Sequence, residues 1–236
     1  MSGLAHRWHV FADADAMADG LCSHLHMQLQ ACFERQDTAL LGLAGGSTPM
    51  AAYAQFTAGT LPWQRLHCVL IDERFVPLHD ERSNEANIAK AFAPVRPQLA
   101  GWHGLMQDSD DIATAAALAD ADVHALARPM DVLVLGMGSD GHLASLFAES
   151  RDYAAAMDPS TALAVVPVRF DADTAVDRLS FTLNELLKAR QACLCITGAE
   201  KREVLNACLN GSGEHFAMAR FLQQYPNPID IFWSPA

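Results

Sequence analysis

The chain has 236 residues, a formal net charge of -12, 51% hydrophobic residues and 19% charged residues. This length suits one large α/β domain or two small ones, and the hydrophobic content argues against a disordered chain. The negative charge argues against binding to a nucleic-acid backbone or to an anionic membrane surface. It is compatible with a small phosphorylated ligand, which a few local cations can hold.

The sequence also limits the compartment and the chemistry of the cysteines. No apolar run approaches the ~20 residues of a membrane-spanning helix, and the N-terminal residues lack the long apolar core of a signal peptide. The six cysteines form no C-x-x-C pair, and Cys68, Cys193 and Cys195 lie in apolar, strand-like runs. We therefore expect a cytoplasmic protein with reduced core thiols and without a zinc site.

Short apolar runs alternate with helix-like segments along the chain, without a repeat or an obvious linker. The predicted strands are 8–12, 39–44, 68–72, 131–137, 162–168, 178–182, 192–197 and 229–233. The predicted helices are 13–35, with Asp13 or Asp15 as N-cap, 50–56, 83–92, which opens with Ser83 as N-cap, 109–127, 183–189, 199–209 and 215–224. Runs that are apolar throughout are typical of strands covered on both faces. We therefore predict a single α/β domain over residues 1–236, with a doubly wound, mainly parallel, Rossmann-like sheet and helices on both faces.

Ligands of such sheets bind beyond the carboxyl ends of the strands. This rule predicts that four loops lie near one another: 45–49, 72–74, 138–142 and 198–201.

The first of these loops, GGSTP, follows an apolar strand and precedes a helix. Gly45 and Gly46 let the backbone approach a ligand closely, and Ser47 and Thr48 add hydroxyl donors. The next helix presents free N–H groups and the positive end of its dipole, which favour an anion. A tight turn with a Ser or Thr cap is the alternative. No Gly-Lys-Ser/Thr follows, so the loop is not a Walker A motif.

Three cationic side chains lie at other strand ends. Arg74, in the triplet D-E-R with Asp72, has a guanidinium suited to bidentate binding of a phosphate or carboxylate. Lys201, one of only three lysines, falls in the first turn of a predicted helix, where it opposes the dipole and invites an anion. Arg178 opens a predicted strand. A solvated charge cluster and a surface ion pair are the alternatives for the two arginines.

The stretch GMGSDGH at 136–142 contains a formal G-x-G-x-x-G. It does not predict nicotinamide binding, because the nearest later acid, Asp158, precedes a proline in a loop rather than ending a strand. His142 stands out because glycines leave it exposed at the end of a strand, where a neutral imidazole can abstract a proton. Asp140 is placed to fix the tautomer of His142 or to contact a substrate. A surface or structural role is the alternative for a lone histidine.

Five motifs occur in order: GGSTP, DERFVP with RSN, GMGSDGHLASLF, RLSFT and GAEK. Together, over about residues 40–210, they resemble the 6-phosphogluconolactonases of the oxidative pentose phosphate pathway. The related glucosamine-6-phosphate deaminases share the fold and several loops. They typically read D-E-Y at the second motif, however, and carry a catalytic glutamate where this chain has Phe147. Arg74 and Phe147 therefore both favour the lactonases.

The resemblance implies hydrolysis of 6-phospho-D-glucono-1,5-lactone to 6-phosphogluconate, without a metal or organic cofactor. His142 is the implied general base, and Asp72 and Asp140 are expected near the sugar and the base. The residues implied to hold the sugar phosphate are Gly45, Gly46, Ser47, Thr48, Arg74, Arg178 and Lys201. The implied partner is a small sugar-phosphate lactone rather than a nucleic acid or a membrane. The sequence sets no oligomeric state, and a monomer is compatible with it.

Three positions depart from the usual residues of this family: Leu143 replaces a threonine, Ala148 a proline and Ser234 an aspartate. None of the three is an implied catalytic group.

Two other functions fit parts of the pattern. In a deaminase or isomerase on the same scaffold, Asp72 would abstract a carbon-bound proton from an open-chain sugar, and Phe147 argues against this. In a non-catalytic sugar-phosphate sensor, the same anion site would bind an effector, and the Asp140–His142 pair argues against that.

Overall fold

The computed structural model describes residues 5–126, 129–172 and 175–235. Seven strands form a parallel sheet in the order β1-β10-β9-β6-β2-β3-β5. Their bounds are β1 His6–Val10, β2 Ala39–Leu43, β3 Leu66–Leu70, β5 Gly101–His103, β6 Val132–Leu135, β9 Ala192–Thr197 and β10 Ile229–Ser234. The predicted α/β class with a mainly parallel sheet is therefore confirmed. The three-residue strand β5 was not predicted.

The helices are α1 Ala14–Phe33, α2 Met50–Ala58, α3 Asn84–Phe92, α4 Ile112–His124, α5 Tyr153–Ala156, α6 Leu183–Leu187, α7 Ala199–Leu209 and α8 Ala217–Gln224, with 3-10 turns at Trp63–Arg65 and Arg96–Gln98. Two expected N-caps are in place, because Asp13 accepts from the Ala16 N–H and Ser83 from the Ala86 N–H. The predicted helix end at Ala127 lies outside the described residues. None of the described helices is long and apolar enough to cross a membrane.

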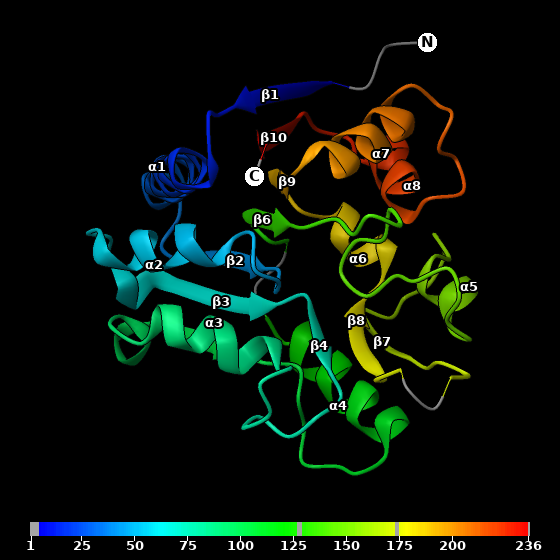
Figure 1. Ribbon diagram of the computed structural model, residues 1–236. Helices are drawn as coiled ribbons and strands as arrows, with labels where there is room; N and C mark the ends of the chain where they lie inside the picture. The colour runs from blue at the N-terminus through cyan, green and yellow to red at the C-terminus, as the bar shows by residue number, and fades with distance from the viewer. Residues whose placement is uncertain (1–4, 127–128, 173–174, 236) are drawn as a thin grey trace.

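The order of the strands explains how the helices divide between the two faces of the sheet. From β1 the chain moves through β2 and β3 to the β5 edge, and it then returns through β6, β9 and β10. Because parallel crossovers are right-handed, opposite directions of travel place their helices on opposite faces. Helices α1, α2 and α3 pack side by side on the outward path, whereas α6, α7 and α8 gather on the return path (Figure 1).

A second, antiparallel sheet in the order β4-β8-β7 stands beside the first. Its strands are β4 Asp72–Arg74, β7 Val165–Val168 and β8 Arg178–Phe181. The prediction that Asp72 ends the strand before it is wrong: the first sheet keeps the chain only to Leu70, and Asp72 opens β4. Ile71 makes the change, because its N–H donates to Leu43 of the parallel sheet while its carbonyl accepts from Phe181 of β8. A continuous apolar run gives no sign of such a switch between sheets.

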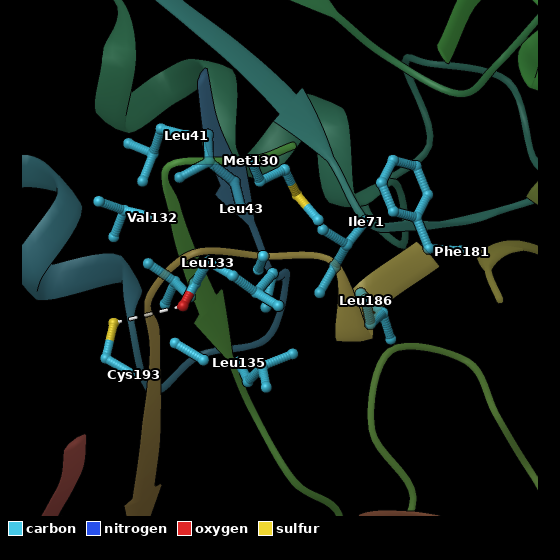
Figure 2. Packing of buried hydrophobic residues seen from close by; sticks show 14 of the residues in the cluster. Leu41, Leu43, Ile71, Met130, Val132, Leu133, Leu135, Phe181, Leu186 and Cys193 are labelled. Atoms are coloured by element: carbon cyan, nitrogen blue, oxygen red, sulfur yellow. Dashed lines mark hydrogen bonds between the residues drawn. The ribbon is translucent and has the colours of Figure 1, made fainter. Parts of the chain in front are cut away.

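The core joins the two sheets beneath the strand ends. Figure 2 shows Ile71 and Phe181 beside the side chains of β2 and β6, all of them buried. Five of the six cysteines are buried and all six are free thiols, as predicted. Burial raises the pKa of the Cys208 thiol to about 11 and that of the Cys195 thiol to about 12. The two sheets therefore share one continuous hydrophobic core.

Candidate active site

A cleft of about 230 Å³ opens where β2, β6 and β9 end and where β4 and β8 face them. Its walls include most of the residues predicted for the site: Gly45, Gly46, Ser47, Thr48, Asp72, Arg74, His142, Arg178 and Lys201. Asp140, the remaining one, contacts His142 from outside the wall. The structure thus brings together all four predicted loops, at the strand ends where parallel sheets bind ligands.

The glycine-rich loop presents unused backbone donors to the cleft. Gly46 has a φ of 89°, which a side chain rarely allows. Gly45 passes so close to Asn84 that an added Cβ would lie 2.1 Å from the amide oxygen. Helix α2 has no side-chain cap, and the N–H groups of 45–48 find no acceptor within the described part of the chain. Those N–H groups and the dipole of α2 form an anion-binding edge.

The loop after β6 holds His142 from two sides. Its Nδ1 lies 2.5 Å from Asp140 Oδ1, and an added Cβ on Gly138 would lie 2.3 Å from its Cε1. The hydrogen bond to Asp140 assigns the proton to Nδ1 and leaves Nε2 as the basic nitrogen. The same bond holds the pKa of Asp140 below its usual value, so this carboxylate stays ionised.

Arg74 and Arg178 lie directly opposite each other on β4 and β8. Like charges at such a position destabilise a sheet. Burial, and then the charge of Arg74, lower the pKa of Arg178. Among the described residues no carboxylate forms an ion pair with either arginine, and a buried Nε of Arg74 has no acceptor. Two unpaired arginines facing one cleft favour an anionic ligand.

Lys201 adds a third positive charge from the opposite side. It lies in the first turn of α7, whose N-cap, Gly198, has a φ of 89° and offers no side-chain cap. No described side chain or carbonyl accepts a hydrogen bond from its ammonium, although it lines the cleft. Lysine opposes the dipole at this end of a helix. An anion between Lys201 and the helix N-terminus would remove that conflict.

Asp72 is fixed within a buried network. Ser145 Oγ donates to its Oδ2 at 2.7 Å, and the Asn84 amide donates to its Oδ1 at 3.2 Å and to its carbonyl at 3.0 Å. Asp72 lines the cleft while only 6% exposed, whereas the Asp140 side chain is 52% exposed. The two aspartates therefore differ: Asp72 is a rigidly held acceptor in the wall of the cleft, and Asp140 is the hydrogen-bond partner of His142.

The sequence assigned no role to three polar residues that build this network, namely Glu73, Asn84 and Ser145. Glu73 accepts from the N–H groups of Arg74, Asn84 and Glu85 and from the Ser83 hydroxyl. Its carboxylate thus ties β4 to the N-terminus of α3, although burial raises its pKa. Asn84 also accepts from Arg74 Nη1 at 2.7 Å. The signals available in the sequence were the triplet RSN and a serine among the apolar residues of HLASLF.

The fold and the cleft define a class: an α/β protein that places a hydrogen-bonded histidine beside three cationic side chains at the carboxyl ends of its strands. A family model for glucosamine-6-phosphate isomerases/6-phosphogluconolactonase matches residues 12–228. The chain belongs to this family, which confirms the resemblance seen in the motifs.

Named relatives cover nearly the whole chain. The 6-phosphogluconolactonase of Mesorhizobium japonicum is 32% identical over 235 residues, which span 100% of this chain and 98% of the relative. That of Pseudomonas aeruginosa is 34% identical over 227 residues, spanning 96% and 94%. The crystal structure of a 6-phosphogluconolactonase from Shewanella baltica has a TM-score of 0.90 at 27% identity and covers 97% of both chains.

Proposed function

We propose that this protein is a 6-phosphogluconolactonase, which hydrolyses 6-phospho-D-glucono-1,5-lactone to 6-phosphogluconate in the oxidative pentose phosphate pathway. One observation carries the proposal: a single cleft is lined by His142, which Asp140 holds from outside the wall, and by three cations that lack a carboxylate partner among the described residues. The names of the full-length relatives support the choice of substrate.

The substrate phosphate binds at the glycine-rich loop and the cations. The N–H groups of 45–48 donate to its oxygens, and Arg74, Arg178 and Lys201 neutralise its charge. The phosphate also relieves the repulsion between the two opposed arginines. With the phosphate at this end, the lactone ring extends toward His142 and Asp72.

His142 acts as a general base toward water. Its Nε2 takes a proton as the water oxygen bonds to the lactone carbonyl carbon, and Asp140 stabilises the imidazolium through Nδ1. The positive charges of the cleft stabilise the negative oxygen that develops on that carbon. The tetrahedral species then expels the ring oxygen, which takes the proton back from His142. The ester C–O bond is broken, and the product is an open-chain acid.

The proposal also includes the domain organisation and the cellular compartment of the enzyme. Residues 1–236 act as one domain in the cytoplasm, where the six thiols stay reduced. The residues proposed for the site line a cleft of a single chain, which is compatible with a monomer.

The test compares wild type with His142→Ala on freshly prepared lactone, after subtraction of spontaneous hydrolysis. We expect kcat to fall by about 10²- to 10⁴-fold, the usual loss of a general base. His79→Ala, at an exposed loop histidine, is the matched control and retains full activity. Ammonia release from glucosamine-6-phosphate is assayed in parallel, and none is expected.

Two results would replace the proposal. Ammonia release without lactonase activity would make the protein a divergent deaminase with Asp72 as its base. Binding of sugar phosphates without turnover of either substrate would make it a sensor.

A further inference from the structure

Phe147 lies between two residues of the site without lining the cleft itself. Its ring centroid is 4.0 Å from that of His142, with 36° between the planes. The guanidinium carbon of Arg178 lies 5.2 Å from the same centroid. One aromatic side chain therefore contacts both the base and a cation of the proposed phosphate site.

The surroundings of Phe147 make it a rigid support. Its N–H donates to the Ser145 carbonyl, and its own carbonyl accepts from the N–H and the hydroxyl of Ser150. Phe170 packs against the ring at a centroid distance of 5.5 Å and an angle of 66°. An aromatic ring has only two rotatable bonds, and a ring held at its backbone and at one edge keeps its orientation.

The contact with Phe147 adds a third support to the imidazole of His142. Asp140 holds Nδ1, and the backbone at Gly138 lies against the Cε1 edge. The ring of Phe147 covers one face, so that Nε2 keeps a fixed direction. The negative face of an aromatic ring also attracts a cation, which favours the imidazolium that forms when water is deprotonated.

The contact with Arg178 serves binding rather than chemistry. Arg178 has no carboxylate partner among the described residues, and the hydrogen bond from its Nε to the Val176 carbonyl is long at 3.3 Å. The cation–π contact with Phe147 is then what orients the guanidinium before a ligand arrives. A fixed guanidinium binds a phosphate with less loss of side-chain entropy.

We propose that Phe147 is a positioning residue that orients the His142 base and the Arg178 cation together. The proposal rests on the proposed function, since it assigns to Phe147 the geometry of the same hydrolysis. It separates two effects: the contact with His142 acts on kcat, and the contact with Arg178 acts on KM.

The experiment measures kcat and KM of Phe147→Leu on 6-phosphogluconolactone, because leucine keeps the apolar bulk and removes the aromatic face. We expect kcat to fall and KM to rise, each by about three- to tenfold. Phe147→Tyr keeps the ring and restores both constants to within about twofold of wild type. Phe33→Leu, at the end of α1, is the matched control, because the Arg65 guanidinium lies over the Phe33 ring at 5.0 Å in a contact outside the cleft. We expect it to change both constants by less than about twofold.

A double-mutant cycle with Arg178→Met makes the test specific. In that background Phe147→Leu should no longer raise KM, while it still lowers kcat. A rise in KM of the same size in both backgrounds overturns the assignment to Arg178. Unchanged constants in Phe147→Leu, or an equal loss in Phe33→Leu, overturn the proposal as a whole.

Controls separate this outcome from others. Thermal unfolding of each variant shows whether it is folded, and Phe147→Met replaces Phe147→Leu if the latter is not. If the wild type does not hydrolyse the lactone, the proposed function fails. If His142→Ala is inactive while Phe147→Leu behaves as wild type, only the role of Phe147 fails.

Discussion

The two walls of the cleft are built on different principles. The loop wall, formed by 45–48, the His142 loop 138–144 and Lys201, follows the ends of the parallel strands. The strand wall, formed by Asp72, Arg74 and Arg178, belongs to the small antiparallel sheet. In the loop wall many donors lack a partner within the described chain. In the strand wall the backbones of β4 and β8 pair with each other, and the side chains of Asp72 and Arg74 are hydrogen-bonded to neighbours.

The difference teaches how the work of the site is divided. Unused N–H groups and a histidine with one free nitrogen are available to a ligand. In the proposed hydrolysis, the loop wall therefore supplies the general base. The strand wall sets two arginines opposite each other, and Glu73 and Asn84 hold Arg74 in place. It therefore presents charges already in place when an anion arrives, which lowers the entropy lost on binding.

The largest expected effect is on the loop wall. Asp140→Asn keeps the size of the side chain, but the asparagine amide N–H can donate to Nδ1. This contact favours the tautomer of His142 that has its proton on Nε2. We expect kcat to fall by about 10²- to 10⁴-fold with little change in KM. Asp110→Asn, at an exposed aspartate, is the control. A rise in KM with normal kcat would instead make Asp140 a substrate contact.

The same pair of proteins gives a pH test of stability. Because the pKa of Asp140 is lowered in the folded state, its ionised form favours folding. The advantage of wild type over Asp140→Asn is then present above about pH 4, the unfolded value for aspartate. It is lost as the pH falls through the lowered pKa. Thermal unfolding of both proteins between about pH 2 and pH 7 measures this difference in stability. A difference independent of pH would contradict the assignment.

The second effect separates phosphate binding from chemistry. Lys201→Met removes a charge that no described group neutralises, and we expect KM for the phosphorylated lactone to rise by about 10- to 100-fold. Hydrolysis of unphosphorylated gluconolactone should not change. Lys188→Met is the control, because the Lys188 ammonium forms an ion pair with Glu185 outside the cleft. An equal loss on both lactones would place Lys201 at the carbonyl rather than at the phosphate.

The loop wall could be predicted from the sequence because its signals are local. Glycines, the start of a helix and a histidine follow apolar runs within a few residues, as in 42–49 and 131–142. The resemblance then added the roles, which spacing alone left open. Helix bounds were less secure: the helix predicted from 109 starts at Ile112, because the Asp111 carboxylate caps the Thr114 N–H.

The strand wall could not be predicted in the same way. Strand β4 has three residues, too few to show a period, and its partner β8 lies about a hundred residues later. Glu73 and Asn84 are charged or polar residues in a polar stretch, so their burial follows only from that pairing. Arg74 and Arg178 were therefore predicted at the ends of two separate strands, and only the structure shows that they lie opposite each other.

The third effect tests whether the strand wall is as rigid as its hydrogen bonds indicate. Asn84→Ala removes a donor to the buried Asp72 and an acceptor for the half-buried Arg74. We expect a loss of about 1–3 kcal/mol in the free energy of unfolding, measured by urea denaturation, and a higher KM. Asn87→Ala, on the exposed side of α3, is the control. A normal KM with lower stability would show that the arginine does not need this support.

The smallest effect returns to the loop wall and has the opposite sign. Ala144, in the His142 loop, has a φ of 48°, the one positive value at a described residue other than glycine. The left-handed conformation is unfavourable for alanine and not for glycine, so Ala144→Gly should raise the free energy of unfolding by about 0.5–1 kcal/mol. The same change at Ala117, in the middle of α4, should lower it by a similar amount. If Ala144→Gly also lowers kcat, the strained residue holds His142 in place, because glycine relaxes the loop that the alanine restrains. A loss of stability at both positions would mean that no strain is stored in the loop.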